Sequence, residues 1–300
     1  MTAPPTDLDP PIVITGADGR GAWSAAGSAV IRRMLKSGGS VLLSVVVIVA
    51  LWEGFIRFYH IQSIVAKDPL DVWRYVFTQK ASQVHGLRSA AGNRSVLIHN
   101  LGITLHDAGI GYLAGIVLAL AVACVFALQR PVEQAFMPVA LMLRSVPLVA
   151  MTPLITLIFG RGILAVAVIG GVVCFFPALV NIMHGIRSTP PARVELLDAY
   201  GAPRRTVLRK VLLPSALPSI FASLRINVPA SVIGALLAEW LATGQGSGQE
   251  MLTVQNTFDY GELWSAVVLV TLASVIAYSV VSAIEAGVLA RYAPDMAAKA

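Results

Sequence analysis

The side chains that most often carry covalent or metal chemistry are thinly spread in this sequence. No His-Glu-x-x-His zinc motif and no Gly-x-Ser-x-Gly nucleophile elbow is present. No Gly-Lys pair occurs, so the phosphate loop is missing and the chain is not expected to bind ATP phosphates in the usual way. The histidines are scattered: His60, His85, His99, His106 and His184. A polytopic membrane enzyme would need clustered His, Asp or Cys, so this class is disfavoured.

Three ionisable residues within long apolar runs are a second place where chemistry could occur, because charge inside a membrane is costly. Glu53 has the spacing for an i,i+4 ion pair with Arg57. Arg144 precedes a predicted helix break at residues 144–147 and could point into a polar pathway. Glu239 could line a pathway, or it could bond within the helix bundle or lie at a membrane interface.

Small and weakly polar residues in the apolar runs indicate packing. Gly111 and Gly115 have the small-xxx-small spacing that allows close helix contact. Cys124 and Cys174 indicate small packing side chains rather than a disulfide or a metal site. Three further residues could line a polar path or form helix-to-helix hydrogen bonds: Asn181, His184 and Asn227.

The segment 187–218 contains residues typical of the starts and ends of two short helices joined by a sharp turn. Thr189 is predicted to cap the first helix, with Pro190 at the first helical position. Gly201 is predicted to end that helix in a left-handed conformation. Pro203 should begin the second short helix and Pro214 should stop it.

The first of these helices has a pattern suited to docking on another protein. Val194, Leu197 and Gly201 fall on one side at three-to-four spacing. A free solvated loop would not need Leu196, Leu197 and Tyr200, so we expect the helix to lie in a groove of a partner.

The elements that carry these residues are expected to be membrane helices. The chain of 300 residues is 56% hydrophobic and only 13% charged, an apolar excess that needs lipid as its solvent. We therefore predict an all-α polytopic membrane domain at residues 37–295, after a disordered tail at 1–36 that is not a cleaved signal peptide. The predicted spans are about Val41–Phe58, Ile103–Leu128, Val132–Phe159 with a break at 144–147, Gly162–Ile186, Ser219–Ala242 and Leu263–Leu289.

The basic residues predict the orientation of these spans, and they explain the net charge of +6 without nucleic acid. Segment 187–218 is rich in Lys and Arg, whereas the loop between the last two spans has acidic residues and no Lys or Arg. Short basic loops stay in the cytoplasm. Both termini and segment 187–218 are therefore expected to be cytoplasmic, although the basic residues in 60–100 weakly oppose this.

The stretch from Glu195 to Pro214 resembles the signature of bacterial ABC importer permeases, which reads Glu-Ala-Ala, three residues, Gly, nine residues, Ile-x-Leu-Pro. Val211 replaces the isoleucine, and Leu196 and Leu197 replace the two alanines. The positions that match at full spacing are Glu195, Gly201, Leu213 and Pro214. Other short motifs look like the nitrate/sulfonate/taurine class of these permeases: Arg144-Ser145-Val146-Pro147, Pro153-Leu154, Phe159-Gly160, and Ala238-Glu239 followed by Gly244, Gly246 and Gly248.

This resemblance implies a methionine-importer-type (MetI-like) bundle of about six transmembrane helices in a bacterial inner membrane. The chain would be a transport subunit and not an enzyme. It would translocate a nitrate-, sulfonate- or taurine-like anion, or a pyrimidine or vitamin precursor. The implied partners are two copies of an ABC ATPase that binds ATP-Mg, an extracytoplasmic solute-binding protein, a second copy of this chain, and membrane lipid. No cofactor is expected in this chain.

The resemblance also assigns candidate residues. Those implied to couple to the ATPase are Val194, Glu195, Leu197, Asp198, Ala199, Gly201, Leu213 and Pro214. Those that could line the translocation path are Arg144, Ser145, Asn181, Asn227 and Glu239. The main alternative is an ion-coupled secondary transporter, which would need buried carboxylates and repeated halves in one chain, whereas no internal repeat is evident.

Overall fold

The computed structural model describes residues 43–62, 64–81 and 88–292. The predicted tail at 1–36 lies outside these residues. The chain divides into two structural units, with the boundary between Ile61 and Gln62. The described part of the first unit is a helix at residues 43–58. On this helix the predicted pair of Glu53 and Arg57 is confirmed, with a carboxylate-to-guanidinium distance of 2.6 Å.

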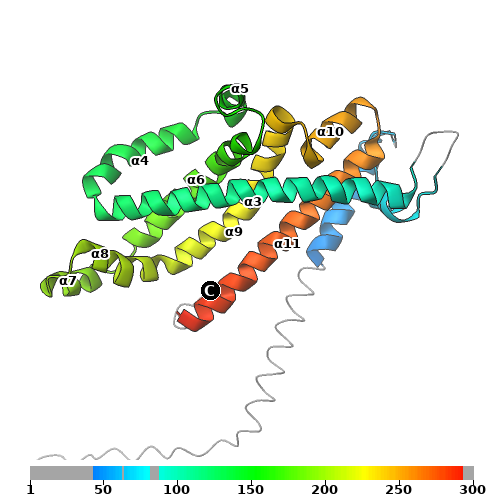
Figure 1. Ribbon diagram of the computed structural model, residues 1–300. Coiled ribbons are helices and arrows are strands. Elements are labelled where there is room, and N and C mark those ends of the chain that lie inside the picture. The colour runs from blue at the N-terminus through cyan, green and yellow to red at the C-terminus, as the bar shows by residue number, and fades with distance from the viewer. Residues whose placement is uncertain (1–42, 63, 82–87, 293–300) are drawn as a thin grey trace, which may run out of the picture. The chain divides into compact units, whose positions relative to one another are not determined.

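The described part of the second unit is built from helices, which Figure 1 shows as a bundle around the long helix α3. Three elements contain wider π turns: η1, η2 and η3. In chain order the elements are α2 (Pro69–Trp73), η1 (Arg74–Thr78), α3 (Ala90–Leu128), α4 (Arg130–Arg144), α5 (Leu148–Phe159), α6 (Ile163–Arg187), α7 (Pro191–Ala199), α8 (Arg204–Val207), η2 (Leu208–Leu212), α9 (Leu213–Ala238), η3 (Glu239–Thr243), α10 (Gly246–Asn256) and α11 (Tyr260–Tyr292).

The bundle has two distinct ends, which α3 joins (Figure 1). We call the first the α7 end: it holds α7, α8 and the C-terminus of α3, where Arg204 Nη1 donates to the carbonyl of Leu128 at 3.2 Å. We call the second the α10 end: it holds α2, η1, α10 and the N-terminus of α3, where Asn93 Nδ2 donates to the carbonyl of Tyr75 at 3.0 Å.

Glycines let α3, α6 and α9 approach one another at the centre of the bundle. A Cβ placed on Gly111 would lie only 2.7 Å from the Cα of Gly170, and one placed on Gly234 would lie 2.9 Å from that same atom. A Cβ on Gly115 would lie 2.6 Å from the carbonyl oxygen of Gly171. The predicted packing role of Gly111 and Gly115 is therefore confirmed, and Gly170 is the point where three helices meet.

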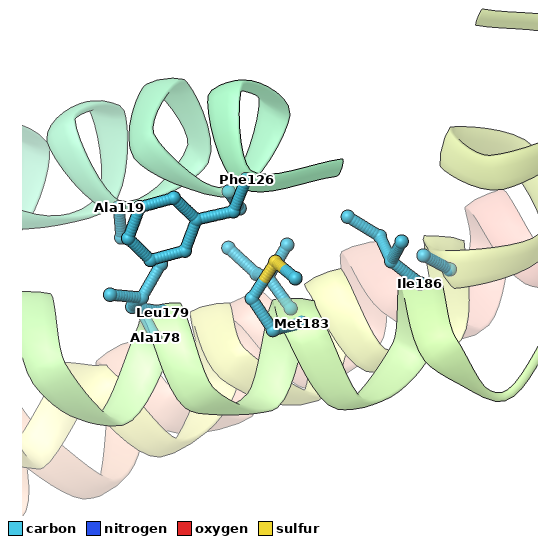
Figure 2. Close-up of a cluster of buried hydrophobic side chains, with 9 residues drawn as sticks. Ala119, Phe126, Ala178, Leu179, Met183 and Ile186 are labelled. Carbon is cyan, nitrogen blue, oxygen red and sulfur yellow. The ribbon is translucent and has the colours of Figure 1, made fainter. Parts of the chain in front are cut away.

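Toward the α7 end, larger side chains fill the space between α3 and α6. Figure 2 shows the Phe126 side chain reaching from α3 toward Leu179 on α6, with Met183 beside it. Ala119 and Ala178 complete the small-against-large packing. Since lipid tails are as apolar as these side chains, close van der Waals contact is the main gain from this packing.

Four of the described helical segments are long and apolar enough to cross a membrane, so the prediction of a polytopic all-α protein is confirmed; the count of six spans stays a prediction. The second span is longer than expected, because α3 starts at Ala90 rather than near Ile103. The four segments are Ala90–Leu128, Ile163–Arg187, Arg204–Thr243 and Tyr260–Leu289.

The predicted break at residues 144–147 is confirmed, but it is sharper than a kink in one span. Helices α4 and α5 meet at 103°. Ser145 terminates α4, and Pro147 has an extended backbone that precedes α5. The residue before a proline disfavours the helical conformation, which explains why the chain leaves the helix here.

The prediction that Pro214 stops a helix is wrong, because Arg204–Thr243 forms one continuous helical segment. The π turn η2 immediately precedes the proline, and the N–H of Leu213 bonds to the carbonyl of Leu208, five residues back. Proline lacks an N–H and crowds the carbonyl four residues earlier. The wider turn relieves this crowding, so the helix continues from the α7 end into the bundle.

The contact at Gly170 gives a stability prediction. Gly111→Ala should lower the free energy of unfolding by about 1–3 kcal/mol, because the added methyl meets the backbone of α6. Thermal unfolding of the detergent-solubilised protein, followed by size-exclusion fluorescence, measures this effect. Gly102→Ala in the same helix is the matched control: nothing lies within 4 Å of its Cβ, so stability should be unchanged or slightly raised. Equal midpoints for both variants would contradict the packing role of Gly111.

Candidate functional site

The α7 end carries a short helix between two long ones. Helix α7 begins one residue later than predicted, with Pro191 at its first position and Pro190 as its N-cap. The prediction that Thr189 caps this helix is wrong, since no side-chain capping bond is formed. Thr189 is instead buried, and its hydroxyl has no hydrogen-bond partner among the described residues.

Gly201 closes α7 with the predicted left-handed turn. Its φ angle is +69°, a conformation that side chains other than glycine and asparagine adopt with strain. The N–H of Gly201 bonds to the carbonyl of Asp198 at 2.9 Å, and the N–H of Ala202 bonds to that of Leu197 at 3.0 Å. These two bonds form a Schellman motif, which satisfies the last carbonyls of the helix and fixes the direction of the chain after it.

The two sides of α7 differ in what they touch. Val194 and Leu197, which were expected to face a partner, are half-buried against this chain. The apolar side chains that point outward are Leu196, 57% exposed, and Tyr200, 81% exposed. The remaining predicted coupling residues Glu195, Asp198, Ala199 and Gly201 are exposed, Leu213 is half-buried and Pro214 is exposed at the start of α9.

A cavity of about 610 Å³ lies beneath α7, between it and the ends of α3, α4 and α6. Its wall includes the buried carboxylate of Glu133 on α4, which forms an ion pair with Arg187 at the end of α6. Glu195 and Asp198 of α7 also line it. The ion pair of Glu133 and Arg187 connects α4 to α6. The cavity beside this pair leaves α7 less closely packed than the long helices.

The translocation candidates Arg144 and Ser145 lie at the bend between α4 and α5. Both are exposed, and the Ser145 hydroxyl donates to the carbonyl of Met142 at 2.6 Å. Asn181 lies half-buried on α6. The bend therefore presents Arg144 at the surface of this single chain, while Asn181 lies on a different helix.

Asn227 and Glu239 are enclosed, with no exposed surface. Asn227 Nδ2 donates to the backbone carbonyl of Ser223 at 2.9 Å, and the backbone carbonyl of Asn227 accepts from the thiol of Cys174 at 3.8 Å. The side-chain amide of Asn227 therefore bonds within α9, whereas the contact with α6 is made by its backbone carbonyl. Its role in a path stays a prediction.

Glu239 holds the N-terminus of α10. The N–H of Gly248 donates to Glu239 Oε2 at 2.6 Å, and the N–H of Ser247 donates to the hydroxyl of Thr104 on α3 at 2.9 Å. A Cβ on Gly248 would lie 2.9 Å from the same carboxylate oxygen, so the backbone approaches closely. A helix N-terminus favours a nearby negative charge. The surroundings of Glu239 fit the structural alternative, and its translocation role stays a prediction.

Two polar features could not be predicted from the sequence because their members are far apart in the chain. A cavity of about 590 Å³ at the α10 end is lined by His99, His106, Asp107, Arg161 and Gln245 among others. Within the membrane segments, Arg225 of α9 pairs with Glu285 of α11 at 3.0 Å. Lone charges in apolar runs were the available signal, and three-dimensional proximity was needed to pair them.

Among the described residues, no group of three or more His, Cys, Asp or Glu side chains is placed to hold a metal ion.

Comparison with known proteins places this geometry in a family. Residues 111–293 match the family described as binding-protein-dependent transport system inner membrane component. The chain is 29% identical over 199 residues to the formylaminopyrimidine transport permease protein ThiX of Halalkalibacterium halodurans, covering 66% of this chain and 80% of that protein. It is 25% identical over 228 residues to the putative aliphatic sulfonates transport permease protein SsuC of Bacillus subtilis, covering 76% and 78%.

Solved structures support the fold. The permease chain of the inward-facing MetNI methionine ABC transporter aligns with a TM-score of 0.59 at 20% identity, covering 66% of this chain and 98% of that one. This similarity confirms the predicted MetI-like bundle. The chain is an ABC transporter permease subunit rather than an enzyme, and it belongs to the family of binding-protein-dependent transport system inner membrane components.

Proposed function

We propose that this chain forms one half of the membrane pathway of an importer and that its α7 end docks on the partner ATPase. The observation that carries this proposal is the exposure of Leu196 and Tyr200 on a helix that ends in the Gly201 turn. Apolar side chains at this position need a groove on another protein, because each is held away from the chain's own core. The ATPase would bind ATP-Mg, since the phosphate loop is missing from this sequence.

The remaining coupling residues divide into two roles. Ala199 is exposed beside Tyr200, whereas Glu195 and Asp198 are exposed and also line the cavity beneath α7; all three would contact the ATPase. Val194 and Leu197 face the bundle and would pass a displacement of α7 to the long helices. Leu213 and Pro214 stand where that displacement would enter α9, directly after the π turn.

The charge distribution supports a cytoplasmic α7 end. The described basic residues of this end include Arg187, Arg193, Arg204 and Arg205. The segment 244–262 at the α10 end contains Glu250, Asp259 and Glu262 but no Lys or Arg. Short basic segments are retained in the cytoplasm. We accordingly propose cytoplasmic termini and a bacterial plasma membrane location, with the α10 end facing a solute-binding protein.

A second copy of the chain would complete the pathway. The bent pair α4–α5 carries large exposed apolar side chains on both halves, including Phe136, Met142 and Leu157. Arg144 and Ser145 lie at the bend, so a symmetric partner covering this pair would bring them to the boundary between the copies. There they would line the path together with Asn181, while Asn227 and Glu239 keep the helices around it in place.

The solute is proposed to be small and polar, like those named for the relatives, which include formylaminopyrimidine and aliphatic sulfonates. Nitrate and taurine are named for two others, from Leptolyngbya laminosa and Escherichia coli. The proposal therefore covers a nitrate-, sulfonate- or taurine-like anion and a pyrimidine or vitamin precursor. The α10-end cavity supports it, because Arg161 and Asp107 offer one hydrogen-bonding group of each charge.

Docking predicts a loss of assembly when the exposed surface of α7 is made acidic. Leu196→Asp with Tyr200→Asp should reduce recovery of the ATPase at least tenfold in co-purification from detergent, because two apolar contacts become charged. Phe258→Asp is the matched control: it removes a side chain that is 73% exposed at the α10 end and should leave recovery unchanged. Full recovery with the double variant would contradict docking through this surface.

The left-handed turn predicts an ordered series of variants at position 201. No atom lies within 4 Å of a Cβ at Gly201, so strain in the backbone alone should decide the outcome. Gly201→Asn should keep most ATPase stimulation by the loaded solute-binding protein, Gly201→Ala should lose part of it, and Gly201→Val should lose nearly all. ATPase assays in liposomes measure this order. Equal activity of the Asn and Val variants would show that the turn geometry is unimportant.

Orientation can be tested by labelling. In a variant with Cys124 and Cys174 replaced by alanine, a cysteine at the exposed Ala192 of α7 should react with a membrane-impermeant maleimide only after cell lysis. A cysteine at the exposed Gln255 of α10 should react in cells whose cytoplasmic membrane is intact. The opposite pattern would reverse the proposed orientation.

A further inference from the structure

An unassigned amphipathic helical segment lies at the α10 end. Elements α2 and η1 run without interruption from Pro69 to Thr78. Leu70, Trp73 and Phe77 recur at three-to-four spacing and are 63%, 59% and 51% exposed. The rings of Trp73 and Phe77 lie with their centroids 4.3 Å apart. The segment therefore presents a continuous apolar stripe away from the bundle.

The opposite side of the segment is fixed to the bundle. Val72 and Tyr75 are buried, and the Tyr75 hydroxyl donates to Glu262 Oε2 of α11 at 3.1 Å. Burial, together with the nearby carboxylates of Glu262 and Asp259, raises the pKa of Tyr75, so the phenol stays neutral and remains a donor. Arg88 lies 3.5 Å from the same oxygen of Glu262. The orientation of the outward stripe is thus set by polar bonds on the inward side.

The position of Tyr75 places the segment where the membrane helices become apolar. Its side chain packs in one cluster with Leu97 of α3 and Ala266 of α11, and Leu101 and Leu263 pack against that cluster. These residues mark the first apolar turns of the two spans. The segment consequently lies level with the first apolar turns of these two spans.

The stripe ends beside the N-terminal turns of α3. The guanidinium of Arg94 lies 6.0 Å from the centre of the Phe77 ring, and its Nη1 donates to the carbonyl of Val76 at 3.0 Å. Ile98 is one turn further along α3 on the same face and is 60% exposed. Ile98 also lines the α10-end cavity with His99 and His106, so the apolar stripe ends at Phe77, with the Arg94 cation beside it.

We propose that α2–η1 is an interfacial anchor whose Leu70, Trp73 and Phe77 insert into the lipid headgroup region of the leaflet at the α10 end. Aromatic side chains collect at this depth because their rings are apolar and their edges tolerate water. Arg74, 3.4 Å from the carboxylate of Asp71, and Arg94 flank the stripe, and long cationic side chains of this kind reach from an apolar surface toward phosphate groups. The stripe lies level with the first apolar turns of α3 and α11, where the headgroups of a surrounding bilayer would lie, so lipid is the occupant that the observations favour.

Nitroxide accessibility in the liposome-reconstituted transporter tests this proposal. Labels at single cysteines replacing Leu70, Trp73 or Phe77, in the variant without Cys124 and Cys174, should collide several-fold more with oxygen than with a water-soluble nickel chelate. Labels at Arg74 and Thr78, which are exposed polar residues next to the stripe on the same helical segment, should show the reverse preference. Chelate-accessible labels at 73 and 77 would overturn the proposal. Labels that become immobilised only when the solute-binding protein is added would also overturn it, in favour of protein docking.

A second measurement avoids labelling. Quenching of tryptophan emission by lipids brominated on the acyl chain should fall in Trp73→Phe relative to the unmodified protein, because Trp73 lies within reach of the bromines. Trp240→Phe tests whether any tryptophan loss gives the same change. An unchanged quenched fraction in Trp73→Phe would place this side chain outside the lipid and reject the anchor.

Discussion

Close backbone contact at Gly170 is the constraint on which the rest of this bundle depends. Gly111 of α3 and Gly234 of α9 both approach the Cα of Gly170 on α6, at distances that leave no room for a side chain. In lipid, helices gain little from hiding apolar surface, so contact of this closeness replaces the hydrophobic effect as the main source of association. The arrangement of the three central helices follows from residues that have no side chain.

This contact also explains how a small helix at the surface can influence the centre of the bundle. Helix α6 leads directly into α7, and the segment from Arg204 to Thr243 leads out of it as one continuous helix. The π turn before Pro214 preserves that continuity where proline would otherwise interrupt it. A partner can shift the conformations of the bundle only through different contacts with each of them. Helix α7 is joined at both ends to helices that meet at Gly170, so a contact that moves α7 acts on the centre of the bundle.

Local sequence rules predicted the features that depend on one or two residues. Gly201 adopts the expected left-handed turn, residues 144–147 break the helix, and Gly111 packs closely. The failures concern competition between local and distant forces. Val194 and Leu197 face the bundle, whereas Leu196 and Tyr200 face outward. All four side chains are apolar, so periodicity alone could not select the exposed side of the helix. The pairing of Arg225 with Glu285 needed the crossing of α9 and α11, which no local pattern encodes.

The most direct test of the account is photo-crosslinking from the exposed surface of α7. A photoreactive amino acid at position 200, in the complete complex in liposomes, should crosslink to the ATPase, and the yield should change when ATP is added. The same amino acid at position 258, at the other end of the bundle, should give no ATPase product. Crosslinks to the ATPase from position 258 and none from position 200 would contradict the claim that α7 is where the ATPase engages this chain.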